Sequence, residues 1–200
     1  MRTYPEYIEV KGARYKLDTS FRTALRCMEL IEDSTISDQE RALAVIYLLL
    51  DEIPEDNLKD IIGLLKKYLE CGREKGPTNN ERDMDLMQDE AYIASSFMYD
   101  YGIDLTKSDM HWWKFIDLLD GLSSECILSR VRDIRTMDIS QYKDPKTRER
   151  LLRARRQVAL KQKEEPQTEE EKKAEALFEA RLKGSNTLDP DDYLLEDEEG

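Results

Sequence analysis

The 200-residue sequence predicts a mostly α-helical protein. We expect a compact domain of about six helices with a small N-terminal β-hairpin, then a charged helical extension and a disordered acidic tail. Two observations support this fold class. Apolar residues recur at helical spacing in successive segments before residue 143, and residues with capping or helix-breaking chemistry separate these segments. The C-terminal part is rich in charge and offers few apolar side chains to a core.

The N-terminal residues predict the β-hairpin. Apolar and polar residues alternate over 6–10 and over 13–17, on either side of a turn at Lys11-Gly12. A hairpin on its own is only marginally stable in water. We therefore expect it to dock on another element or to pair with another chain.

Two helices are expected after the hairpin. Asp18-Thr19-Ser20 caps the first, over about 21–31, and its inward residues are Phe21, Leu25, Met28 and Ile31. Ser37 and Glu40 form a capping box that opens the second, which runs to about Leu50. Because residues 42–50 are apolar on every side, we expect other elements to surround this second helix.

The third and fourth helices are separated by a polar stretch. Pro54 is placed in the first turn of the third helix, where its missing N–H costs little. Its inner face is expected to hold Leu58, Ile61, Ile62, Leu65, Tyr68 and Leu69. Residues 72–83 are polar and rich in helix breakers, which indicates an exposed loop. The fourth helix covers about 84–101, and Gly102 ends it.

Residues 110–122 hold both tryptophans and the only histidine of the chain. Asp109 is the expected N-cap of this helix and Gly121 its C-terminal stop. We assign four of its side chains to the core: Trp112, Trp113, Phe115 and Leu119. Replacing Trp113 or Phe115 by alanine is expected to cost about 3–5 kcal/mol of stability. Ser123-Ser124 is the expected cap of a sixth helix, over about 125–134, with Ile127 among its inward residues.

The C-terminal part divides by charge. Residues 144–163 carry eight basic and two acidic side chains, whereas residues 186–200 carry seven acidic and no basic ones. Asp144-Pro145 opens a helix in which five arginines form a candidate partner-binding set: Arg148, Arg150, Arg153, Arg155 and Arg156. Three interpretations stay open, namely a solvated helix, a site for an acidic partner, or contact with nucleic-acid phosphates. The net charge of −13 argues against nucleic acid as a partner.

These patterns divide the chain into three parts: a helical domain over 1–143, a charged helical extension over 144–185 and the acidic tail over 186–200. Three widely spaced cysteines argue against a disulfide framework. The longest apolar run has nine residues, far short of the ~20 that a membrane span needs. We therefore expect a soluble protein that functions in a reducing cytoplasm and has no membrane partner.

No catalytic or metal-binding pattern stands out. His111 is the only histidine, and we interpret it as a partly buried structural residue rather than as part of a catalytic triad. The cysteines form no C-x-x-C pair, and the acidic run of Asp83, Asp85, Asp89 and Glu90 lacks the glycine of a calcium loop. Phosphate-binding glycine motifs are absent. We expect a protein that is not an enzyme and that uses no cofactor and no metal.

Three stretches carry a resemblance to a known family. They are Tyr99-Asp100-Tyr101-Gly102-Ile103-Asp104-Leu105, then Met110-His111-Trp112-Trp113-Lys114-Phe115 with Leu118-Leu119-Asp120-Gly121-Leu122, and then Arg135-Thr136-Met137-Asp138-Ile139. With these residues the chain resembles the phage "gene product fifteen" family, small proteins of the tail-gene region in tailed phages and prophages of Gram-positive hosts. The likeness covers roughly residues 4–160, and the paired tryptophans are its most specific element.

The resemblance implies a function. The family is similar to tail assembly chaperones, which bind the long helical tape-measure protein and keep it soluble for tail tube assembly. It implies the tape-measure protein as partner, the tail tube protein as a further candidate, and the host bacterial cytoplasm as location. A homo-oligomer remains open. Two other classes compete: a structural tail component retained in the virion, and a nucleic-acid adaptor that acts through the arginine-rich helix 144–163.

Overall fold

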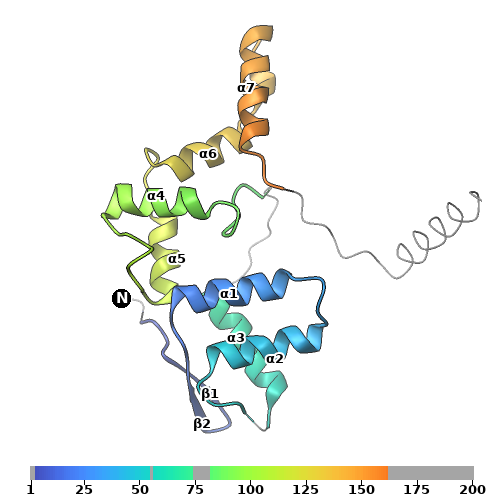
Figure 1. The fold of residues 1–200 in the computed structure, drawn as a ribbon, viewed down its shortest axis with the longest axis vertical. Helices are drawn as coiled ribbons and strands as arrows, with labels where there is room; N and C mark the ends of the chain where they lie inside the picture. Colours follow the sequence, from blue (N-terminus) through green and yellow to red (C-terminus); the bar gives the residue numbers. More distant parts are fainter. Residues whose placement is uncertain (1–2, 55, 74–81, 162–200) are drawn as a thin grey trace, which may run out of the picture. The chain divides into compact units, whose positions relative to one another are not determined.

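The computed structural model describes residues 3–54, 56–73 and 82–161, and residues 1–160 form one compact unit (Figure 1). Its elements are β1 (Tyr7–Val10), β2 (Ala13–Lys16), α1 (Phe21–Glu32), α2 (Asp38–Leu49), α3 (Leu58–Leu69), α4 (Glu90–Tyr101), α5 (Trp112–Asp120), α6 (Ile127–Thr136), the 3-10 helix η1 (Ile139–Gln141) and α7 (Pro145–Gln157). The predicted fold class, mostly helical with a small N-terminal hairpin, is confirmed. The predicted acidic tail and most of the predicted 72–83 loop lie outside the described residues.

The β-hairpin docks on the helices, as its marginal stability alone requires. β1 and β2 pair antiparallel, with Tyr7 opposite Lys16 and Val10 opposite Ala13. Both turn residues have positive φ, 49° at Lys11 and 87° at Gly12, which matches the twist of a two-residue hairpin. The buried side chains of β1 face α3, and an isolated bridge between Leu17 and Leu50 ties the hairpin to the end of α2.

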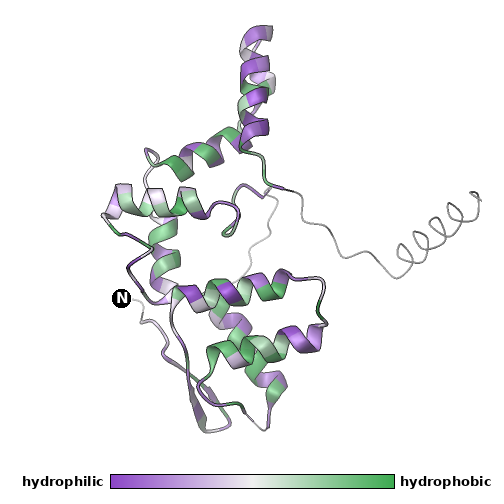
Figure 2. Cartoon of the chain, viewed as in Figure 1, coloured by the Kyte–Doolittle hydropathy of each residue, from purple (hydrophilic) through white to green (hydrophobic). Residues whose placement is uncertain are grey.

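The core is built around aromatic side chains of α1, α4 and α5. Phe115 stacks on three other rings, with centroid distances of 4.9 Å to Phe21, 5.2 Å to Phe97 and 5.7 Å to Trp112. All four side chains are buried. Burial of such large apolar surfaces is the main stabilising contribution to a domain of this size. Figure 2 shows the contrast with α7, which is largely hydrophilic and has no buried residue.

The prediction that α2 is surrounded on every side is wrong. Val45, Ile46 and Leu49 are buried, but Leu43 is 54% exposed and Tyr47 is 72% exposed. Helices α1 and α3 pack against α2, and its outer face carries apolar side chains into solvent. The apolar segment 42–50 therefore belongs to a helix at the surface of the unit and not to a central helix.

Several expected helix starts are also wrong. α3 begins at Leu58, after Asn57 in a left-handed conformation with φ of 61°, so Pro54 precedes the helix. α4 begins at Glu90, because residues 86–89 form a turn. The N-cap of α5 is His111 instead of Asp109, and that of α6 is Cys126. Four residues expected to face inward are exposed: Ile31, Leu58, Ile62 and Ile127.

Gly63 in the middle of α3 offers a stability test. A Cβ added at Gly63 would meet no atom within 4 Å, and its φ is not positive. Glycine inside a helix costs about 0.5–1 kcal/mol relative to alanine. We expect Gly63→Ala to raise the free energy of unfolding by about that amount, measured by urea denaturation. Unchanged or lowered stability would show that α3 is not a regular helix at this position.

Candidate partner-binding site

The two tryptophans hold the end of α3. The indole N–H of Trp112 donates to the carbonyl oxygen of Leu69 over 3.0 Å, and that of Trp113 donates to the carbonyl of Tyr68 over 2.9 Å. The last carbonyls of a helix have no partner within the helix. The two indoles thus bind two adjacent carbonyls at the end of α3, of which that of Tyr68 also accepts the backbone N–H of Cys71 over 2.9 Å. This gives the tryptophan pair a structural role.

His111 caps the helix that follows it. Its Nδ1 accepts the backbone N–H of Trp113 over 3.0 Å, so the imidazole occupies the N-cap position of α5. Nε2 lies 3.0 Å from the carbonyl oxygen of Pro5, to which it can only donate. The ring also stacks on Tyr4 at 5.0 Å. These contacts fit the structural histidine that the sequence indicates.

The other members of the predicted motif set lie in the core. Phe115 and Leu119 are buried in α5, together with Trp112, and Trp113 is half-buried. The aromatic motif therefore positions helices instead of presenting a surface to a partner. A binding site has to be sought elsewhere on the unit.

The acidic run from Asp83 to Asp89 is paired with arginines. The two carboxylate oxygens of Asp89 accept from the guanidinium of Arg135, each over 2.7 Å, and Asp89 is 1% exposed. Asp83 pairs with Arg132 over 2.9 Å, and Asp85 pairs with Arg82. Nε of Arg135 donates to the carbonyl of Val158, and Nη1, which also donates to Asp89, donates to the carbonyl of Asp83. This run fastens the turn before α4 to α6 and to the end of α7.

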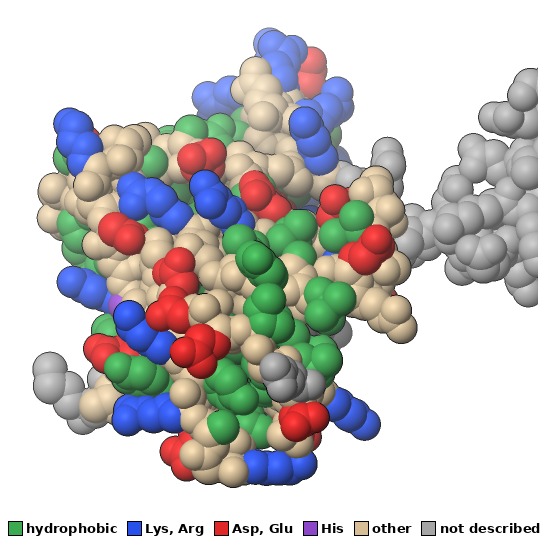
Figure 3. Space-filling model, turned by 60° about the horizontal axis from the view of Figure 1, so that its bottom comes forward, with side chains coloured by type: hydrophobic (Ala, Val, Ile, Leu, Met, Phe, Trp, Pro, Cys, Tyr) green, Lys and Arg blue, Asp and Glu red, His purple; other side chains and the backbone are tan. Residues whose placement is uncertain are grey.

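Five large exposed apolar residues lie within a short stretch of chain. We define the α2–α3 apolar surface by these residues: Leu43, Tyr47, Ile53, Leu58 and Ile62. They come from α2, α3 and their connection, and the two helices pack together. Figure 3 brings this end of the unit forward and shows hydrophobic side chains in the middle of the face, with charged side chains around them. Exposed apolar surface of this kind is typical of protein–protein contact sites.

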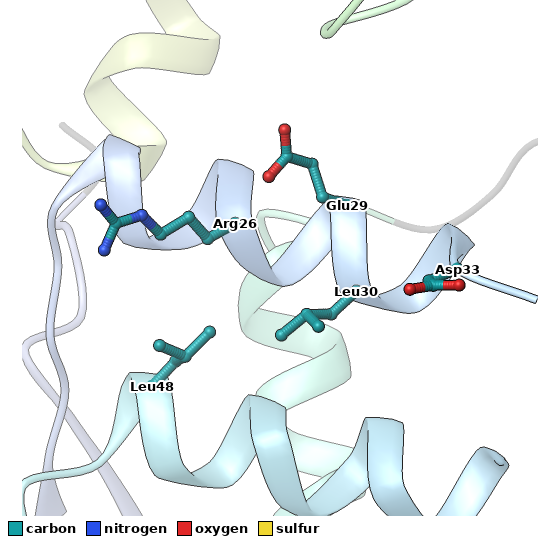
Figure 4. A pocket seen from close by; sticks show the side chains of 5 residues that line it. All are labelled: Arg26, Glu29, Leu30, Asp33 and Leu48. Atoms are coloured by element: carbon teal, nitrogen blue, oxygen red, sulfur yellow. The ribbon is translucent and has the colours of Figure 1, made fainter. Parts of the chain in front are cut away.

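Two hollows flank the outer face of α1. One, of about 470 Å³, lies between α1 and α2, and Figure 4 shows Leu30 and Leu48 pointing into the space between these helices. The other, of about 360 Å³, lies between α1, α4 and residues 105–106. Arg26 and Glu29 of α1 line both.

The five candidate arginines of α7 have two different surroundings. Arg148, Arg150, Arg153 and Arg156 are exposed, and Arg153 pairs with Glu149 over 3.3 Å. Arg155 is half-buried and donates to the carbonyl oxygen of Met137, so it fastens α7 to the segment before η1. Four of the five thus remain available to a partner. Their role in binding stays a prediction.

Other chemistry finds little support in the part of the chain that the structure describes. The thiols of Cys27, Cys71 and Cys126 are buried, and burial, with a smaller effect of Asp18, raises the pKa of Cys27 to about 12. Across residues 3–54, 56–73 and 82–161, no group of His, Cys, Asp and Glu could hold a metal ion. No helix in these ranges has the length and apolar character of a membrane span.

Comparisons with known proteins give one match. The family model described as "Bacteriophage Gp15 protein" matches residues 3–160. No curated protein and no solved structure gives a significant match. The matched range contains the β-hairpin and all seven α-helices of the described residues.

Proposed function

The chain belongs to the Bacteriophage Gp15 protein family, and from this membership we propose that it is a tail assembly chaperone without enzymatic activity. Its partner is the tape-measure protein of the phage tail. The chaperone covers apolar helices of that protein and keeps them soluble until the tail tube forms. The α2–α3 apolar surface is the structural observation that supports this proposal.

The chemistry of this surface suits an apolar or amphipathic helix. Leu43 and Tyr47 are four residues apart on α2, and Leu58 and Ile62 are four residues apart on α3. Each pair therefore forms a ridge one helical turn long. A partner helix with apolar residues at i, i+4 and i+7 can lie against such ridges. Removal of this surface from water would contribute about 25 cal/mol per Å².

Co-expression with the tape-measure protein tests the proposal. We expect the chain to raise the soluble fraction of the tape-measure protein and to co-purify with it. The double variant Leu43→Ser/Tyr47→Ser should lose both effects, because it removes the apolar ridge of α2. Its free energy of unfolding should change little, since both side chains are mostly exposed.

The matched control lies on α4. Met98 and Tyr99 are 48% and 68% exposed, close to the 54% of Leu43 and the 72% of Tyr47. The variant Met98→Ser/Tyr99→Ser removes a similar apolar surface and should retain full chaperone activity. If both variants raised the soluble fraction of the tape-measure protein equally poorly, a site on α2 would be contradicted. If the parent chain did not raise that fraction, the chaperone function itself would be contradicted.

The exposed arginines of α7 support one alternative, a nucleic-acid adaptor. With up to four phosphate contacts, the logarithm of the DNA affinity should fall against the logarithm of salt concentration with a slope of about −3 to −4. Binding of the tape-measure protein through apolar contacts should weaken only modestly with salt. A salt series with both ligands separates these functions, and mass spectrometry of purified particles tests a structural role in the virion.

A further inference from the structure

The outer face of α1 carries two charged residues without a partner. Arg26 and Glu29 are both exposed, and neither side chain forms a hydrogen bond or an ion pair with any residue that the structure describes. They do not pair with each other although they are three residues apart. Leu25 and Leu30 flank them, half-buried, at the edges of the two hollows.

The charge distribution of α1 is opposite to the one that stabilises an isolated helix. Acidic residues stabilise the first turn of a helix and basic residues stabilise the last, each by about 0.3–1 kcal/mol. α1 instead has Arg22 in its first turn and Glu32 in its last, with no acidic residue in the first turn and no basic one in the last. Within the helix, Arg26 precedes Glu29, which is the less favourable order for an intrahelical pair. The stability of α1 therefore does not explain this pattern.

The charged and apolar residues along α1 form a self-complementary pattern. About the midpoint between residues 27 and 28, Arg26 is related to Glu29, Leu25 to Leu30, and Arg22 to Asp33. Two identical helices can pair antiparallel about a two-fold axis at that midpoint. Each Arg26 then lies opposite Glu29 of the second copy. Arg22 and Asp33 already have hydrogen-bond partners within the chain, so Arg26 and Glu29 carry the complementarity.

We infer that α1 forms an isologous contact with α1 of a second copy of this chain. A closed two-fold contact needs a self-complementary surface, and this face provides one with both charge signs and apolar edges. Stable interfaces bury roughly 1,200–2,000 Å² in total, more than a single helix pair covers. We therefore expect a weak dimer in which residues at the rims of the two hollows add contacts. The contact involves α1 and not the α2–α3 apolar surface, so it stands apart from the proposed function.

Sedimentation velocity of the full chain over a wide concentration series tests this contact. The parent chain should show a monomer–dimer equilibrium. The single variants Arg26→Glu and Glu29→Arg each give positions 26 and 29 the same charge. A dimer of either variant therefore contains two pairs of like charges across the two-fold axis. Each single variant should weaken dimerisation by about tenfold or more. An equimolar mixture of the two variants should dimerise again, because each Arg26→Glu chain then faces a Glu29→Arg chain with opposite charges.

Lys59→Glu is the control, since Lys59 is exposed on α3 and the substitution changes charge by the same amount as Arg26→Glu. It should leave the dimerisation constant unchanged. Circular dichroism of each variant shows whether the fold is retained. A monomeric parent at all concentrations would overturn the inference, and so would single variants that dimerise like the parent or a mixture that stays monomeric.

Discussion

Trp112→Ala is expected to lower the free energy of unfolding by about 3–5 kcal/mol, measured by urea denaturation of the full chain. Trp112 is 2% exposed and stacks on Phe115 at the centre of the aromatic core. The substitution leaves a large cavity and also removes the indole donor from the carbonyl of Leu69 at the end of α3. The loss of the ring's buried apolar surface and the loss of the donor to this carbonyl both lower the free energy of unfolding.

Two related variants separate these contributions. Trp112→Phe keeps an aromatic ring but loses the N–H donor to the carbonyl of Leu69, which then keeps only the thiol of Cys71 at 3.9 Å. Its cost should be about 1–3 kcal/mol, less than that of the alanine variant. Trp113→Ala should fall at the lower end of the 3–5 kcal/mol range, because Trp113 is only half-buried. If Trp112→Ala unfolds at the urea concentration of the parent, α5 is not the centre of the core.

Arg135→Met is the second substitution with a large expected effect, a loss of about 3–5 kcal/mol. It leaves the carboxylate of Asp89, which is 1% exposed, without its bidentate partner. It also removes the donors to the carbonyls of Asp83 and Val158, so three segments lose their common contact. Arg135→Lys should recover only part of this loss, since an ammonium group cannot make the two parallel bonds of a guanidinium.

A double variant distinguishes a buried charge from lost packing. In Arg135→Met/Asp89→Leu no uncompensated carboxylate remains, so the double variant should be more stable than Arg135→Met alone. Urea denaturation of the parent, both single variants and the double variant completes the cycle. A loss of unfolding free energy in the double variant that exceeds the sum of the losses in the two single variants would contradict the assigned role of the ion pair.

Local signals in the sequence predicted much of the fold. The capping box of Ser37 and Glu40 opens α2, Asp144 and Pro145 open α7, and Gly102 ends α4 with φ of 65°. Each of these signals acts within one helical turn, so neighbouring residues suffice to detect it. The ion pair of Asp89 and Arg135 joins residues 46 positions apart, and no local pattern indicates it.

The candidate site could not be located from the sequence. Residues 42–50 are apolar on all sides, and a helix buried on every face has the same pattern as one whose outer face is apolar and exposed. Only the packing of α1 and α3 against α2 shows that Leu43 and Tyr47 remain outside. The tryptophan pair, which carries the resemblance most specifically, fastens α5 to α3, with Trp112 buried and Trp113 half-buried.

Site-specific photo-crosslinking tests the proposed partner surface most directly. A photoreactive phenylalanine analogue replaces Tyr47 in one variant and Tyr99 in another, two tyrosines of similar exposure on α2 and α4. Each variant is co-expressed with the tape-measure protein and irradiated, and crosslinked products are identified by mass spectrometry. We expect a crosslink to an apolar helix of the tape-measure protein from position 47 and none from position 99. Crosslinking from position 99 alone, or from neither position in a complex that co-purifies, would contradict binding at the α2–α3 apolar surface.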